Sequence, residues 1–174
     1  MNSIDNPNEV SLEEMLFARE RRAEIQNTLL QTYHAPIISF TLNIPGPVKV
    51  YSKIPEAFKK GCEQIETALE QAGISFFPAK TLKEKTGYEA FFCANASPEV
   101  LKKLMTTLEE DTPLGRLYDI DVLQNDGIKV SREDFGLPPR VCLLCSEPAH
   151  SCSRSRRHSV EELTARIMEL ISEL

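Results

Sequence analysis

Stretches with β-strand character alternate with stretches of helical periodicity between residues 36 and 123. The predicted strands are 36–43, 74–79, 88–94 and 116–123, and the predicted helices are 55–72 and 97–111. The resulting order of strand, helix, strand, strand, helix, strand is that of the split β-α-β unit. The pattern therefore predicts an α+β fold with a ferredoxin-like core.

Further elements are expected to pack around this core. Ser11 with Glu14, and Ser159 with Glu162, form capping-box patterns that predict helices over 11–33 and 159–174. Asn125-Asp126-Gly127 is typical of a tight turn and predicts that 128–131 forms a hairpin with the strand before it. A chain of 174 residues favours a single domain over 1–174, with 140–158 as a candidate small zinc-knuckle segment.

Composition excludes several classes of protein. Apolar residues make up 41% and charged residues 26% of the chain, which argues against a largely disordered protein. The net charge of −6 does not favour a nucleic-acid-binding surface. Because no stretch approaches the roughly 20 apolar residues of a membrane span, and Met1–Val10 is too polar for a signal sequence, we expect a cytoplasmic protein without membrane contact.

Two carboxylates, Asp119 and Asp121, lie two residues apart in a strand-like segment that is otherwise apolar. Side chains two residues apart in a strand share one face, so the two charges repel each other unless a cation lies between them. Mg²⁺ held by the two acids and a substrate phosphate fits this pattern, and phosphoryl or nucleotidyl transfer is the chemistry it serves. Gly115 would let the backbone approach a phosphate closely. The alternative is a solvated strand face.

Three of the five cysteines lie close together near the C-terminus. Cys142, Cys145, Cys152 and His158 have the spacing C-x2-C-x6-C-x5-H, which predicts a tetrahedral Zn²⁺ site with a structural role. The alternative is that these thiols are packing or reactive residues. Cys62 and Cys93 lie in apolar periodic segments and are predicted to be buried packing residues.

Arginines concentrate in the last third of this acidic chain, where they could attract an anionic ligand. Guanidinium groups bind phosphate with two parallel hydrogen bonds, which makes these residues candidates for substrate binding. A solvated basic loop is the alternative for the final cluster of three. The candidates are Arg116, Arg132, Arg140, Arg154, Arg156 and Arg157.

These motifs together resemble the apo-citrate lyase phosphoribosyl-dephospho-CoA transferase family, also called holo-citrate-lyase acyl-carrier-protein synthase or CitX. The resemblance extends over nearly the whole chain, including Glu20-Arg21-Arg22 and Pro45-Gly46-Pro47. The motifs that carry it are G-R-L-Y-D-I-D-V at 115–122, Ser131-Arg132, L-P-P-R-V-C-L-L-C at 137–145 and C-S-R-S-R-R-H at 152–158.

The resemblance implies a nucleotidyltransferase. Such an enzyme moves the phosphoribosyl-dephospho-CoA group from 2'-(5-triphosphoribosyl)-3'-dephospho-CoA to a serine of the acyl-carrier subunit of citrate lyase and releases pyrophosphate. Paired acids, Mg²⁺ and arginines would serve that reaction. Two other readings stay open from the residues: a non-enzymatic zinc-knuckle module that binds a partner protein, and a nucleotidyltransferase that acts on another acceptor.

Overall fold

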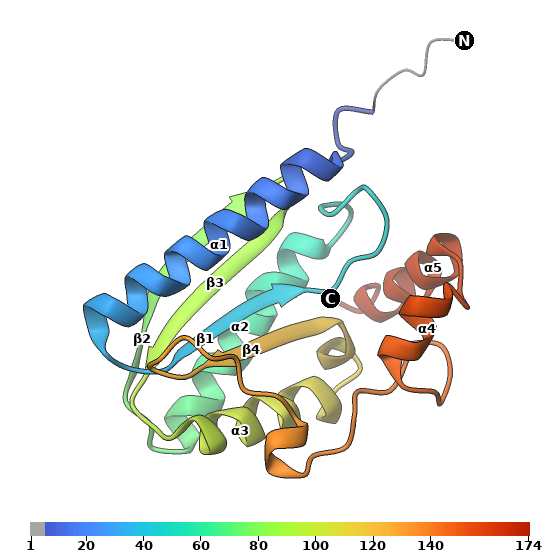
Figure 1. The fold of residues 1–174 in the computed structure, drawn as a ribbon. Helices are drawn as coiled ribbons and strands as arrows, with labels where there is room; N and C mark the ends of the chain where they lie inside the picture. The colour runs from blue at the N-terminus through green and yellow to red at the C-terminus, as the bar shows by residue number, and fades with distance from the viewer. Residues whose placement is uncertain (1–5) are drawn as a thin grey trace.

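A four-stranded antiparallel sheet in the order β2-β3-β1-β4 forms the centre of the computed structural model, which describes residues 6–174 (Figure 1). The first five residues of the Met1–Val10 stretch lie outside the described residues. All three strand pairings are antiparallel, and β1 lies between β3 and β4. The strands are β1 (Ile37–Leu42), β2 (Phe76–Glu84), β3 (Gly87–Ala94) and β4 (Tyr118–Leu123).

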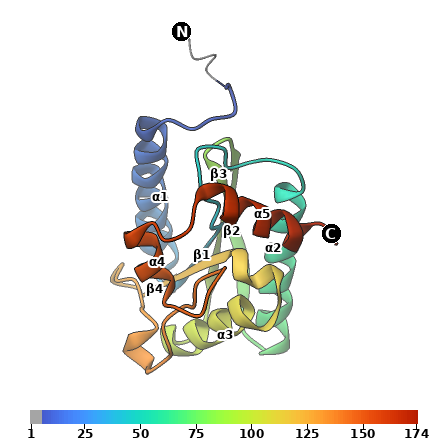
Figure 2. The same ribbon diagram turned by 90° about the vertical axis from the view of Figure 1, so that its right-hand side faces the viewer.

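Helices cover both faces of the sheet, with α1 on one face and α2 and α3 on the other (Figure 2). The C-terminal helices α4 and α5 lie beyond one end of β1 and β4 (Figure 1). None of the helices in the described part of the chain combines the length and apolar character that a membrane span needs. The helices are α1 (Leu12–Tyr33), α2 (Ile54–Gln71), α3 (Pro98–Asp111), α4 (Ala149–Ser155) and α5 (Val160–Ile171).

The main core lies between the sheet and α2, α3 and α5, and a second apolar cluster lies under α1. Phe40 stacks on Phe58 with ring centroids 5.2 Å apart and meets Tyr118 edge to face. Ile167 of α5 is fully buried in the same core. Residues of α5 thus contribute directly to the main core.

The α+β class and the order of elements between Ile37 and Leu123 are as predicted. Local signals explain this agreement: Ser97 caps α3 with Pro98 in its first turn, and both capping boxes form as expected. Gly73 adopts a φ of 68° just after α2, a conformation that glycine takes at low cost.

Four details differ from the prediction. Strand β2 begins at Phe76 and extends to Glu84, well beyond the predicted end at residue 79. Strand β4 begins at Tyr118, because Leu114–Leu117 form a 3₁₀ turn. The predicted hairpin partner 128–131 is not a strand: it pairs through one isolated bridge, between Leu123 and Lys129. Helix α4 was not predicted, because seven residues show too little periodicity to identify a helix.

The outer edge of β4 is paired mainly by side chains, apart from the bridge at Leu123 and the Val130 N–H that donates to the Val122 carbonyl. Glu109 of α3 accepts a hydrogen bond from the Ile120 N–H at 2.9 Å. The same carboxylate forms an ion pair with Arg132 and lies 3.7 Å from Nη1 of Arg140. Because an unpaired strand edge exposes hydrogen-bonding groups, this network both completes the sheet and anchors the segment that follows β4.

Candidate functional site

Asp119 and Asp121 lie on the face of the sheet that α1 covers. Tyr118, Ile120 and Val122 point the other way, into the main core. The alternation of side chains in β4 is thus as predicted. Asp121 forms an ion pair with Lys129, with Oδ1 and Nζ 2.6 Å apart. The two carboxylates therefore lie on one face with one cation beside them, an arrangement that fits a divalent cation held together with phosphate oxygens.

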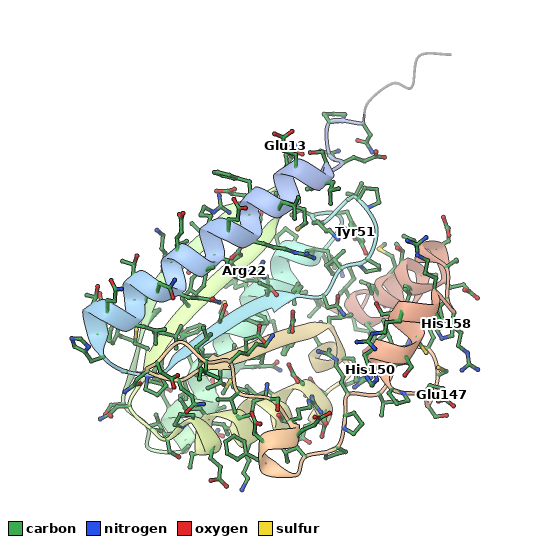
Figure 3. All side chains as sticks on the ribbon, in the orientation of Figure 1. Glu13, Arg22, Tyr51, Glu147, His150 and His158 are labelled. Atoms are coloured by element: carbon green, nitrogen blue, oxygen red, sulfur yellow. The ribbon has the colours of Figure 1, made fainter. Side chains whose placement is uncertain are left out.

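Polar side chains from the neighbouring strands extend this surface. Thr41 of β1 lies opposite Asp119 on one side and opposite Glu89 of β3 on the other, so these three residues form a row across the sheet. Glu89 is 2% exposed and accepts a hydrogen bond from Nε of Arg22 at 2.9 Å. Figure 3 labels Arg22 on α1. Sequence reasoning missed this pair, although a lone glutamate among the apolar residues of β3 was a usable signal.

Burial, and then the negative charge of Asp121, raise the pKa of the Asp119 carboxyl above its ordinary value. The positive charges of Lys129 and Arg140 oppose this shift. Ionisation of Asp119 therefore lowers the free energy of unfolding, even though this side chain is exposed. Two carboxylates that share one face of a strand have this property, because each disfavours ionisation of the other.

This cost predicts a pH-dependent gain in stability for Asp119→Asn. The folded state binds the Asp119 proton more tightly than the unfolded chain, so ionisation lowers stability as pH rises from the ordinary pKa of 3.8 through the raised value. The free energy of unfolding of the variant relative to the parent should therefore increase over that window. Urea unfolding at a series of pH values without divalent cations measures this; parallel pH profiles for the two proteins would contradict it.

The four predicted zinc ligands converge. One ligand atom from each of Cys142, Cys145, Cys152 and His158 lies within 4.8 Å of all the others. The Cys145 and Cys152 sulfurs are 3.5 Å apart, and Nε2 of His158 is 3.4 Å from the Cys145 sulfur. Tetrahedral Zn–S bonds of about 2.3 Å place two sulfurs roughly 3.8 Å apart, so the cluster fits a zinc ion.

Local structure brings these ligands together. Cys142 and Cys145 lie in a turn that is closed by the bridge between Val141 and Pro148, and Cys152 lies on α4. His158, which Figure 3 labels, follows α4. Within residues 6–174 this is the one group of three or more His, Cys, Asp or Glu side chains close enough to share a metal ion. The predicted cluster is confirmed as a site that could bind a metal such as zinc.

The electrostatics of the cluster favour a cation. Burial raises the pKa of the Cys142 thiol, but hydrogen bonds from the Leu144 and Cys145 N–H groups and from the Cys152 and Cys145 thiols together lower it overall. Burial and the neighbouring Cys145 and Cys142 thiols raise the pKa of Cys152 to about 12. A thiolate at Cys142 thus opposes ionisation of Cys152, and a bound metal ion would compensate the negative charge of both.

Cys62 and Cys93 have the packing role that was predicted. Burial raises the pKa of Cys62 to about 12 and that of Cys93 to about 11. Cys93 is buried in the cluster under α1, and Cys62 is half-buried against the main core.

Three of the arginines predicted to bind substrate are engaged in contacts within the protein. Arg116 donates from Nη2 to the Val141 carbonyl, and Arg140 donates from Nη1 to the Tyr118 carbonyl, each at 2.5 Å. Arg132 is held by the carboxylates of α3. These contacts fasten the cysteine-containing segment to the sheet, close to the acidic pair.

The other three arginines, Arg154, Arg156 and Arg157, are exposed on α4 and the turn that follows it. Arg156 lines a pocket beside the metal cluster, whereas Arg154 and Arg157 do not. Gly115 is buried against the backbone of α3, where a Cβ atom would collide with the Leu108 carbonyl. Close packing thus gives a reason for this glycine that does not involve phosphate.

Comparison with known proteins matches most of the chain. The model of the family described as apo-citrate lyase phosphoribosyl-dephospho-CoA transferase matches residues 10–174. A probable apo-citrate lyase phosphoribosyl-dephospho-CoA transferase of Vibrio cholerae is 42% identical over 92% of this chain and 91% of its own length. A protein of the same description from Streptococcus pyogenes is 41% identical over 93% of this chain and 85% of its own length.

A third relative is much longer. The protein CitXG of Haemophilus influenzae is 37% identical over 92% of this chain, which corresponds to 35% of the length of that relative. A domain like this one thus also occurs within a longer polypeptide.

Proposed function

Because the chain belongs to the apo-citrate lyase phosphoribosyl-dephospho-CoA transferase family, and is therefore a transferase, we propose that it attaches phosphoribosyl-dephospho-CoA to the acyl-carrier subunit of citrate lyase. The donor is 2'-(5-triphosphoribosyl)-3'-dephospho-CoA and the acceptor is a serine hydroxyl. The observation that carries the proposal is the family match over residues 10–174. The acidic pair on the sheet supports it, because that arrangement suits phosphoryl chemistry.

The proposed reaction is a displacement at phosphorus. The serine oxygen attacks the α-phosphorus of the donor, the bond from that phosphorus to the β-phosphate oxygen breaks, and pyrophosphate leaves with the bonding electrons while the hydroxyl loses its proton. Asp119 and Asp121 would hold Mg²⁺, and the bound ion would offset the negative charge on the leaving group. Lys129 holds Asp121 in position, and Arg140 adds positive charge near Asp119.

We assign zinc a structural role in the same enzyme. Four protein ligands leave no open coordination position, which is typical of structural zinc sites. The cluster would fix the turn around Cys142 and Cys145 against α4, and Arg116 and Arg140 join this segment to β4. Zinc would thereby hold the C-terminal segment beside the acidic pair.

One incubation tests the transfer. The full chain, Mg²⁺ and the triphosphate donor are mixed with the apo acyl-carrier subunit, and the carrier is then weighed by mass spectrometry. We expect the mass of the carrier to increase by one phosphoribosyl-dephospho-CoA group and pyrophosphate to appear in equal amount. A carrier whose acceptor serine is replaced by alanine is the control and should stay unmodified. An unchanged wild-type carrier would contradict the proposal, and modification of a different acceptor would redirect it.

A further inference from the structure

A pocket of about 580 Å³ lies between the 43–49 loop, the 3₁₀ turn before β4 and the C-terminal segment. Its volume is within the range of roughly 300–1,000 Å³ that is usual for small-molecule sites. Cys142, Cys152 and His158 of the metal cluster form part of its wall. Asp119 and Asp121 do not line it, so the pocket is a feature separate from the acidic pair.

The pocket is positively charged in a chain of net charge −6. None of the described residues that line it is an aspartate or glutamate, whereas four are basic: Lys49, Arg116, Arg140 and Arg156. Within residues 6–174, neither Lys49, Arg116 nor Arg156 has a carboxylate within ion-pair distance. A concave surface with several uncompensated cations attracts a polyanion.

Burial disfavours the charge of one of these cations, and the backbone of another has a conformation that is unusual for its residue type. Burial, and then the positive charge of Arg19, lower the pKa of the Lys49 ammonium, which donates a hydrogen bond to the Ile44 carbonyl at 2.7 Å. Arg156 ends α4 with a φ of 49°, a left-handed conformation in which glycine or asparagine is usual. A bound anion would compensate both charges and gives a reason for a long basic side chain at position 156.

The rest of the pocket is largely apolar. A ligand that fills it must therefore combine anionic groups with an extended apolar portion. Dephospho-CoA combines these features, because a pyrophosphate joins its nucleoside to a long pantetheine arm whose methyl and methylene groups alternate with two amides. The larger apolar side chains of the wall include Ile44, Val141, Leu143, Val160, Leu163 and Ile167.

We propose that this pocket binds the dephospho-CoA portion of the donor, with the pyrophosphate near Lys49 and Arg156 and the pantetheine arm against the apolar wall. The identity of the ligand rests on the proposed function. Arg140 connects the two regions, since it lines the pocket and its charge acts on Asp119. Binding of the unreactive part of the donor here would orient the triphosphate toward the acidic pair.

Calorimetry with dephospho-CoA alone tests the proposal without any transfer step. We expect binding to the full chain, and a loss of about tenfold in affinity for Lys49→Met and for Arg156→Gly, as is usual when a charged hydrogen-bonding partner of a ligand is removed. Methionine keeps the length of Lys49, and glycine suits the backbone at 156. Lys59→Met removes an exposed lysine on α2, outside the pocket, and is the matched control that should bind within about twofold of the parent.

A third variant acts by repulsion. Val160→Asp places a carboxylate in the pocket wall at the N-terminus of α5, where an acidic residue favours the helix, so the fold should persist while affinity falls at least tenfold. The pocket assignment would be overturned if dephospho-CoA did not bind the parent, or if it bound Lys49→Met, Arg156→Gly and Val160→Asp as tightly as the parent. Either result would count even if transfer to the carrier occurs. Pocket-dependent binding without any transfer would instead contradict the proposed function.

Discussion

Replacement of either Asp119 or Asp121 by asparagine should reduce transfer to the carrier at least a hundredfold. Asparagine keeps the size of the side chain and removes the charge that would hold Mg²⁺, and the loss of charge stabilisation in an active site costs several kcal/mol of transition-state binding. Initial rates at saturating donor and several Mg²⁺ concentrations measure the effect. Part of the activity should return at high Mg²⁺ if the remaining carboxylate still binds the ion.

The fold should survive both replacements. Asp121 loses its contact with Lys129, but that ion pair is 60% exposed on the lysine side and contributes less than about 1 kcal/mol. Asp111→Asn, an exposed position at the end of α3, is the control that removes one negative charge elsewhere. Near-normal turnover in both site variants, with circular dichroism unchanged, would show that the acidic pair does not hold the catalytic ion.

Removal of zinc should lower the thermal stability of the protein. Metal-binding energy contributes to folding energy, and Cys142, Cys145, Cys152 and His158 hold the segment that packs against the core through α5. A loss of about 3 kcal/mol lowers Tm by roughly 6–12 °C in a domain of this size. Scanning calorimetry with and without a chelator measures this change, and dephospho-CoA binding should weaken in parallel because the cluster forms a wall of the pocket.

Single substitutions separate coordination from packing. Cys145→Ser should abolish stoichiometric zinc in elemental analysis, because it removes a ligand that contacts both Cys152 and His158. Cys62→Ala is the matched control: this half-buried thiol on α2 is not part of the metal cluster, so zinc content should stay near one ion per chain. Freshly purified parent protein without zinc would reduce the cluster to a group of packed thiols.

Much of the fold could be predicted from the sequence, because helix caps and hydrophobic periodicity depend on residues that are close together in the chain. The capping boxes at Ser11 and Ser159 act within one turn of helix, and the periodicities of β1 and α2 depend on which face each residue buries. The short helix α4 and the single bridge at Lys129 were not predictable in this way, because neighbours distant in sequence determine them.

Part of the candidate site was also predictable from the sequence, and part was not. The sequence by itself determined that Asp119 and Asp121 share a face, because strand geometry requires it, and the C-x2-C pair with its following Cys and His indicated a metal cluster. Only the tertiary structure showed that Glu109 forms ion pairs with Arg132 and Arg140, and that Lys49 and Arg156 line one pocket. Spacing along the chain determines which side chains a strand or turn presents together, whereas charge compensation and concavity depend on which distant segments pack against each other.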